Sequence, residues 1–430
     1  MNIAVLGMWH LGTVVAGCLA SANYSVIAFD QNEETIRALK DGKPPVNEPG
    51  LEELVRSGMG KGLLRFSSSP EDVTGSDIVW VAYDTPVDDE DQADVDFVIH
   101  HTCSLFPHIK PGALVIVSSQ LPIGSVSALE QNYRRNFPGR PVSFACLPEN
   151  LRLGKAISVF MNPDRVVAGV RCKEDRDRIE FLLRPFTSSI VWMSVESAEM
   201  TKHALNAFLA TSVAFANELA AICERYGADA SEVEKGLKTD VRIGPGAYLK
   251  PGNPFAGGTL VRDINFLLSL GRRKQLPTHL ISGVMQSNNA HRLWSRNKLS
   301  EVLGDIRGMK VAVLGLTYKP GTDTLRRSES VETCKWLNEQ GAFVSAFDPT
   351  VKTLPGAIAE FILLAPSITV ALSNAHAVII ATEWPEFRAV TAEDILQQMD
   401  HPVVLDPGRF LGPSIGNDKR IRYLTVGNLS

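Results

Sequence analysis

The sequence has few cysteines and no long run of any one chemical type. Its six cysteines are scattered over 430 residues without a C-x-x-C pair, so we expect no disulfide framework and no metal site. No stretch approaches about 18 uninterrupted apolar residues, and no basic residue precedes Arg37, so neither a membrane span nor a signal peptide is expected. These absences predict a cytoplasmic protein without a membrane partner.

Charge and composition exclude further classes of protein, from nucleic-acid-binding to fibrous and disordered ones. Lys and Arg form no long runs and the net charge is −5, so a nucleic-acid partner is not expected. Hydrophobic residues make up 44% and charged residues 21%, which is typical of globular proteins and excludes disorder, collagen and coiled coil. At roughly 150 residues per domain, the length predicts about three domains.

Two segments of the chain contain the same order of elements. Residues 2–30 read as an apolar strand (NIAVLG), a turn with glycine, a helix of small residues and a strand that Asp30 closes. Residues 310–348 repeat this order, from KVAVLG to the strand that Asp348 closes. Further strands are expected near residues 77–83, 113–119, 142–146, 165–170, 190–193, 377–382 and 403–406. Short apolar runs that alternate with helices indicate parallel strands with right-handed crossovers. We therefore predict an α/β fold with two Rossmann-like, doubly wound parallel-sheet domains.

Between these regions, residues 196–226 contain no Gly or Pro, and their apolar positions recur at steps of three and four. This pattern predicts one long central helix that joins the two domains. A helix in this place is suited to the centre of a two-fold homodimer, and a purely intramolecular spine is the alternative.

The first glycine turn has the context of a dinucleotide-binding site. It follows a strand, opens a helix, and is followed by an acidic residue at the end of the next strand. In such a turn the pyrophosphate binds at the helix N-terminus, and the acidic side chain binds the adenosine ribose, which favours NAD over NADP. Trp9 replaces the second glycine of the G-x-G-x-x-G fingerprint, so a structural turn without cofactor is the alternative. The predicted cofactor contacts are Gly7, Trp9, His10, Leu11, Gly12 and Asp30.

Further motifs follow in a fixed order. They are NEPGLE at 47–52, DTP at 84–86, LPIG at 121–124, PENLR at 148–152 and NPDR at 162–165, then Lys202 and Asn206, the loop 242–263, GLTYK at 315–319, and Arg326. In order and spacing, over nearly the whole chain, they resemble the UDP-glucose/GDP-mannose dehydrogenase family. The resemblance implies an NAD-binding domain over residues 1–195, a central helical dimerisation domain over 196–300 and a nucleotide-sugar-binding domain over 301–430. It also implies oxidation of the C6 alcohol of a nucleotide-sugar, with a UDP-hexose favoured, through two hydride transfers and a cysteine thioester.

The resemblance also implies roles for single residues. Glu149 corresponds to a general base or water-activating carboxylate, and Asp263 to the group that organises the water and the nucleophile. Lys202 and Asn206, one helical turn apart, correspond to groups that stabilise the developing alkoxide.

Ligand contacts follow from the same resemblance. The cofactor site gains Thr85, Pro86, Gln120 and Arg326. The implied substrate contacts are Leu151, Arg152, Arg242, Tyr248, Phe255, Gly257 and Lys319, with Arg242 directed to the sugar of a partner subunit.

The sequence departs from the family at the nucleophile. Thr259 stands at the cysteine position, and its hydroxyl is not ionised at neutral pH, so a thiohemiacetal at this position is excluded. Further departures are Trp9, Asp84, Gln120 and Leu147. Cys146, three residues before Glu149, is either a displaced nucleophile or a small buried strand residue.

Three outcomes are open at this point. In the first, the protein oxidises the alcohol once and stops at the aldehyde. In the second, it completes both oxidations through an aldehyde hydrate. In the third, it binds nucleotide-sugars without catalysis. Retention of Glu149, Lys202, Asn206 and Asp263 favours retained chemistry, because a binding protein has no evident use for this set.

Overall fold

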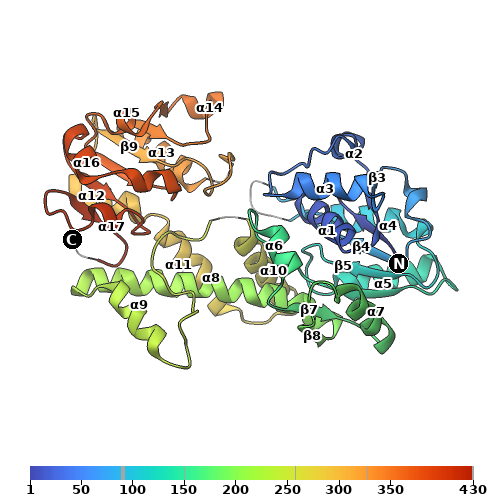
Figure 1. Ribbon diagram of the computed structural model, residues 1–430. Coiled ribbons are helices and arrows are strands. Elements are labelled where there is room, and N and C mark those ends of the chain that lie inside the picture. Colours follow the sequence, from blue (N-terminus) through green and yellow to red (C-terminus); the bar gives the residue numbers. More distant parts are fainter. Residues whose placement is uncertain (89–92, 150, 257, 327, 429–430) are drawn as a thin grey trace. The chain divides into compact units, whose positions relative to one another are not determined.

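The computed structural model describes residues 1–88, 93–149, 151–256, 258–326 and 328–428. The chain forms two compact units, unit 1 (Met1–Leu205) and unit 2 (Asn206–Ser430). Helix α8 (Val195–Tyr226) crosses the boundary between them (Figure 1). The division into three domains stays a prediction.

Unit 1 contains an eight-stranded sheet in the order β3-β2-β1-β4-β5-β6-β7-β8. Its strands are β1 (Asn2–Leu6), β2 (Ser25–Phe29), β3 (Leu64–Ser67), β4 (Ile78–Val81), β5 (Leu114–Val117), β6 (Ser143–Cys146), β7 (Val166–Gly169) and β8 (Ile190–Met193). Neighbouring strands run parallel except β6 and β7, which pair antiparallel with Cys146 opposite Gly169. The predicted doubly wound sheet is confirmed, with this one reversal.

The helices of unit 1 cover both faces of the sheet. They are α1 (His10–Ser21), α2 (Glu33–Lys40), α3 (Leu51–Gly60), α4 (Val95–Ser104), α5 (Ser125–Asn136), α6 (Ala156–Met161) and α7 (Lys173–Leu183), with 3-10 helices η1 (Pro70–Val73) and η2 (Phe106–His108). Ile3 and Val5 of β1 pack into one core, whereas Ala4 and Leu6 pack into the other. Because successive side chains of a strand point to opposite faces, a strand buried on both faces needs the continuous apolar run seen in the sequence.

Unit 2 contains a six-stranded parallel sheet in the order β11-β10-β9-β12-β13-β14. Its strands are β9 (Lys310–Leu314), β10 (Phe343–Phe347), β11 (Leu363–Leu364), β12 (Ala377–Ile380), β13 (Val403–Leu405) and β14 (Arg422–Leu424). Its helices after α8 are α9 (Ala230–Thr239), α10 (Thr259–Lys274), α11 (His279–His291), α12 (Trp294–Leu303), α13 (Glu329–Glu339), α14 (Gly356–Ala359), α15 (Ile368–Leu372), η3 (Pro385–Ala389), α16 (Ala392–Gln398) and α17 (Gly412–Ile415).

The two predicted repeats adopt the same local structure. Gly7 and Gly315 have φ values of +91° and +93°, which favour glycine. The Gly7 amide donates to the Phe29 carbonyl at 2.9 Å, and the Gly315 amide donates to the Phe347 carbonyl at 2.8 Å. In both sheets the strand order switches direction beside the first strand of the repeat, at β1/β4 and at β9/β12. Open α/β sheets bind ligands at such switch points.

The predicted central helix is confirmed as α8, 32 residues long. By length and composition alone α8 could cross a membrane, and 33% of its most apolar stretch is buried within the chain. No such segment was predicted, because charged residues interrupt the apolar run. Hydropathy averaged over a window tolerates a few charges, and helices of soluble proteins pass the same test.

Candidate cofactor and substrate sites

Unit 1 has a cavity of about 280 Å³ near the switch point of its sheet. The turn after β1 forms one wall, and the segment that follows β4 forms another. The lining residues are Gly7, Met8, Trp9, Asp30, Tyr83, Asp84, Pro86 and Phe97. Four of them, Gly7, Trp9, Asp30 and Pro86, belong to the predicted cofactor contacts. Met8, Tyr83, Asp84 and Phe97 were not among the predicted contacts. Asp84 belongs to the DTP motif and was noted only as a departure from the family, whereas Tyr83 and Phe97 occupy no motif position.

The turn after β1 fits a diphosphate. A Cβ atom at Gly7 would lie 2.5 Å from the Tyr83 ring, so this position requires glycine. Trp9 is the N-cap of α1, and no side chain caps the helix there. The Trp9 side chain is 52% exposed, so the bulky replacement projects outward and does not fill the turn. A helix N-terminus with backbone N–H groups is a suitable site for the pyrophosphate of NAD.

Asp30 is fixed beside this turn. Its Oδ2 accepts from the Met8 amide at 2.6 Å, and its Oδ1 accepts from the Asn32 amide at 2.9 Å. A carboxylate oxygen has two lone pairs, so both oxygens retain capacity for a ribose hydroxyl. The donor set and the turn together fit NAD.

His10 and Glu48 tie the start of α1 to a neighbouring loop. His10 Nε2 lies 3.0 Å from Glu48 Oε2, and the buried Glu48 carboxylate also accepts from the Gly154 and Ala156 amides at 2.8 Å each. Glu48 therefore has a structural partner on each side, which gives a physical reason for the NEPGLE motif.

Glu149 and Lys202 lie together in unit 1. Lys202 Nζ donates to the Glu149 carbonyl oxygen at 2.6 Å and lies 4.0 Å from Glu149 Oε1. Glu149 Oε2 accepts from the Leu151 amide at 2.5 Å. A cavity of about 20 Å³ borders both side chains together with Gln120 and Cys146. This is enough room for one water molecule.

The surroundings of Cys146 disfavour the thiolate form. Its side chain is buried, and burial, with a smaller contribution from Glu199 and Glu196, raises the pKa of the thiol far above its usual range. Because the thiolate is the nucleophile, this geometry favours the buried strand residue over the displaced nucleophile.

Asn206 and Asp263 meet in unit 2. The Asn206 amide donates to Asp263 Oδ2, and both side chains are buried. Thr259 is the exposed first residue of α10, one helical turn before Asp263. The chain has no cysteine between Cys223 and Cys334, so none accompanies this cluster in sequence.

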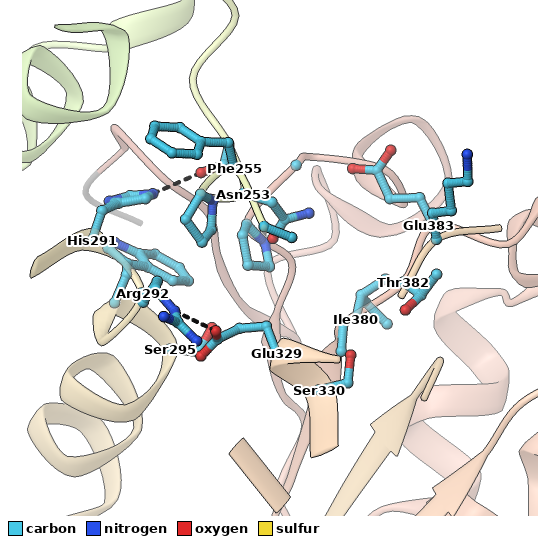
Figure 2. Close-up of a pocket in the computed structure, with 18 of the residues that line it drawn as sticks. Asn253, Phe255, His291, Arg292, Ser295, Glu329, Ser330, Ile380, Thr382 and Glu383 are labelled. Atoms are coloured by element: carbon cyan, nitrogen blue, oxygen red, sulfur yellow. Dashed lines mark hydrogen bonds and ion pairs between the residues drawn. The ribbon is translucent and has the colours of Figure 1, made fainter. Parts of the chain in front are cut away.

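Unit 2 contains a larger cavity, of about 490 Å³ (Figure 2). Its walls come from the loop before α10, the end of α11, the turn after β9, and the segments that follow β12 and β13. Tyr248, Phe255 and Lys319, three predicted substrate contacts, line it. Lining residues that were not predicted include His291, Arg292, Glu329, Glu383 and Gly408.

Hydrogen bonds and ion pairs shape this cavity. His291 Nε2 contacts the Gly252 carbonyl oxygen at 2.7 Å, and Arg292 Nε donates to Glu329 Oε2 at 2.5 Å (Figure 2). Burial lowers the pKa of His291, so a neutral ring that donates to Gly252 fits this contact. Burial raises the pKa of Glu383 and the nearby Lys250 opposes that shift, so this carboxyl takes up a proton more readily than usual.

The remaining predicted residues lie elsewhere. Thr85 is buried, and its hydroxyl donates to the Gln120 carbonyl at 2.7 Å. Arg242 is exposed and pairs with Asp240 at 2.7 Å, outside the lining of the unit 2 cavity. Leu151 and Arg152 belong to unit 1, and Arg326 is an exposed residue of unit 2. Gly257 lies outside the described residues.

Comparison with known proteins covers all three regions of the chain. Residues 1–187 match the NAD binding domain of the UDP-glucose/GDP-mannose dehydrogenase family, residues 196–290 its central domain and residues 312–413 its UDP binding domain. The UDP-glucose 6-dehydrogenase TuaD of Bacillus subtilis is 33% identical over 409 residues, which cover 94% of this chain and 88% of the relative.

Solved structures agree with this match. The UDP-glucose dehydrogenase of Pyrobaculum islandicum has a TM-score of 0.87 at 28% identity, covering 100% of this chain and 98% of that chain. The UDP-D-ManNAc dehydrogenase of Pyrococcus horikoshii has a TM-score of 0.85 at 25% identity, covering 99% of both chains. The chain therefore belongs to the UDP-glucose/GDP-mannose dehydrogenase family of nucleotide-sugar dehydrogenases, whose cofactor is NAD.

Proposed function

We propose that this protein oxidises the C6 alcohol of a UDP-hexose to the aldehyde with NAD, without an enzyme thioester. The pairing of Glu149 with Lys202 beside a water-sized cavity carries the proposal. The bond between Asn206 and Asp263 supports it, and so does Thr259, which the sequence resemblance assigns to the family's cysteine position. The groups needed for a first hydride transfer are present, and the thiol needed for the usual second transfer is replaced.

The turn at Gly7 and the N-terminus of α1 would hold the pyrophosphate of NAD, and Asp30 would hold the adenosine ribose. NAD, when bound, accepts the hydride. The Glu149 carboxylate takes the proton of the C6 hydroxyl, and the Lys202 ammonium stabilises the alkoxide that forms. Removal of the hydroxyl proton by Glu149 would thus prepare the alcohol for loss of a hydride from C6, which gives the aldehyde.

A thioester route would need a reactive thiol, and the most deeply buried cysteines do not supply one. Burial raises the pKa of Cys18 to about 12 and the pKa of Cys146 and Cys334 still further. A second candidate is oxidation of the aldehyde hydrate to the uronic acid. The water-sized cavity beside Glu149 and Lys202 favours it over any thiol-dependent route.

The unit 2 cavity is the proposed nucleotide-sugar site. Lys250, Arg292 and Lys319 line it and supply positive charge for a diphosphate. A UDP-sugar is favoured because residues 312–413 match a UDP binding domain and the compared proteins act on UDP-sugars by name. Arg242 is proposed to reach the sugar site of a partner subunit, and the cytoplasm is the proposed compartment.

We propose a homodimer built on α8. Phe208, Phe215 and Ile222 follow one another at seven-residue spacing and are 70%, 49% and 56% exposed. A seven-residue repeat keeps large apolar side chains on one stripe of a helix, and an exposed stripe of this kind is typical of an interface.

A ligand panel tests the proposal. Thermal unfolding with UDP-glucose, GDP-mannose, NAD and NADP should show the largest rises with NAD and with a UDP-sugar, because ligands that bind the native state stabilise it. The UDP-sugar that raises the unfolding temperature should then yield NADH. Binding of a UDP-sugar without NADH formation would instead identify a non-catalytic relative.

A further inference from the structure

Glu199, in the second turn of α8, places a buried carboxylate at the start of another helix. The side chain is 5% exposed. Its Oε2 accepts from the Gly124 amide at 2.7 Å, and its Oε1 accepts from the Val126 amide at 2.9 Å. Gly124, the N-cap of α5, has φ +90° and no side chain of its own. Glu199 therefore satisfies the first amides of α5 from outside, where negative charge is also favoured by the helix dipole.

A second residue of α8 holds the same segment. His203 is 1% exposed, and its Nε2 lies 3.0 Å from the Leu121 carbonyl oxygen. Glu199 and His203 are four residues apart and thus share one face of the helix. α8 is therefore fixed at two points to residues 121–126.

Lys202 lies between these two attachments and reaches the Glu149 carbonyl oxygen. On the other side, Thr85 bonds to the carbonyl of Gln120, the residue just before the clamped segment. Thr85 and Gln120 are predicted cofactor contacts, and Lys202 is the predicted alkoxide stabiliser. Glu199 thus connects the segment that follows Gln120 to the helix that carries Lys202.

Burying the Glu199 carboxylate costs free energy, and capping a helix does not require a buried charge from another helix. Burial penalises the charged form of Glu199 and raises its pKa, against the stabilising effect of the two amides. Helices α2, α4 and α13 are capped locally by Asn32, Asp94 and Ser328, without a buried charge from another element. At the start of α5 the chain has glycine, and the carboxylate comes from the helix that carries Lys202.

We propose that Glu199 is a positioning residue, which locks the first turns of α8 to residues 121–126 so that the Lys202 amine has a fixed place relative to the cofactor. The inference rests on the role given to Lys202 under Proposed function. Small displacements of a catalytic group are expensive, since a shift of about 1 Å can cost on the order of 100-fold in rate.

The test compares Glu199→Gln with Glu130→Gln. Glu130 is also a buried carboxylate of unit 1, bound to Arg134 at 2.7 Å and Arg171 at 2.8 Å. In Glu199→Gln the new side-chain amide can accept from one backbone N–H but turns a donor toward the other. With UDP-glucose and NAD, Glu199→Gln should lower kcat about tenfold or more. Its KM for the nucleotide-sugar should stay unchanged, and the deuterium isotope effect at C6 should rise because the chemical step has slowed.

Glu130→Gln should destabilise the fold to a similar degree but leave kcat and the isotope effect unchanged. Equal kinetic effects of the two variants, or an unchanged kcat in Glu199→Gln, would overturn the inference. Lys202→Ala separates the positioning role of Glu199 from the proposed function itself. If Lys202→Ala is inactive while Glu199→Gln keeps the full kcat, only the positioning role fails. If Lys202→Ala keeps full activity, or the wild type forms no NADH, the proposed function and this inference fail together.

Discussion

Single side chains divide the proposed chemistry between cofactor and substrate. Asp30 was predicted from its place after the second strand, and it lines the unit 1 cavity. Tyr83, Phe97 and Glu383 were missed, because they reach their cavities through tertiary packing and occupy no motif position. The sequence could predict which residue types a site needs, but not which neighbours the fold adds to its walls.

Asp30→Ala should lower the affinity for NAD by about 10- to 100-fold, which is the usual cost of a lost hydrogen bond to a charged group. Affinity for the nucleotide-sugar should not change. Calorimetric titration of both ligands measures this. Asp348→Ala is a matched control, because Asp348 makes the equivalent turn contact in unit 2, to the Leu316 amide at 2.8 Å. If Asp30→Ala lowered the affinity for NAD and for the nucleotide-sugar equally, the cofactor assignment would be contradicted.

Lys202→Ala should lower kcat by about 10²–10³, the usual effect of removing one group that stabilises a developing oxyanion. Steady-state NADH formation with a UDP-sugar gives the value. Lys238→Ala is the control, since Lys238 pairs only locally with Glu234 on α9, at 2.6 Å. A Lys202→Ala enzyme that retained most of its turnover would remove Lys202 from the mechanism.

At the scale of elements, the apolar runs predicted most strands and the central helix. The edge strands β3, β11 and β14 were missed. Arg65 and Arg422 interrupt the apolar pattern of β3 and β14, and β11 has only two residues. The antiparallel pairing of β6 with β7 was also beyond sequence reasoning, since a strand's residues do not record the direction of its neighbour. The repeat of strand, glycine turn, helix and strand was predictable, because the turn itself requires glycine at positive φ.

The exposed stripe of α8 leads to a test of assembly. Phe215→Glu should convert the homodimer to a monomer, because it places a charge in the centre of an apolar interface. Sedimentation at micromolar concentration measures the mass. Phe343→Glu, at a residue that is 68% exposed at the start of β10, should leave the dimer intact. A wild-type monomer would refute the assembly.

The start of β4 is tied to its neighbours by a carboxylate. Asp77 Oδ1 lies 2.5 Å from Lys110 Nζ, and Asp77 Oδ2 accepts from the Asn2 amide at 2.8 Å. These contacts, Lys110 first, hold the pKa of Asp77 below its usual value of 3.8. A lowered pKa stabilises the fold above pH 3.8 and ceases to do so as the pH falls through the folded-state value. Asp77→Asn should thus lower Tm modestly at neutral pH, since the pair is partly exposed, and the difference should shrink below pH 3.8. A difference in Tm that does not change with pH would contradict this.

At the scale of the whole molecule, the predicted pair of Rossmann-like sheets and the family are confirmed. The division of labour between the units stays a prediction, as does the homodimer. Two local features bear on the proposed chemistry. The position that the sequence resemblance assigns to the family's cysteine holds Thr259, which stays a prediction, and burial raises the pKa of the thiols of Cys146 and Cys334. The proposed chemistry therefore differs from the route that the resemblance implies in the number of hydride transfers and in the absence of a covalent intermediate.

The ratio of NADH formed to UDP-sugar consumed tests that claim most directly, combined with mass spectrometry of the quenched enzyme. The account predicts one NADH per sugar, free aldehyde and no adduct on the protein, with the same ratio in Cys146→Ala. Two NADH per sugar together with a trapped adduct on Cys146 would contradict it.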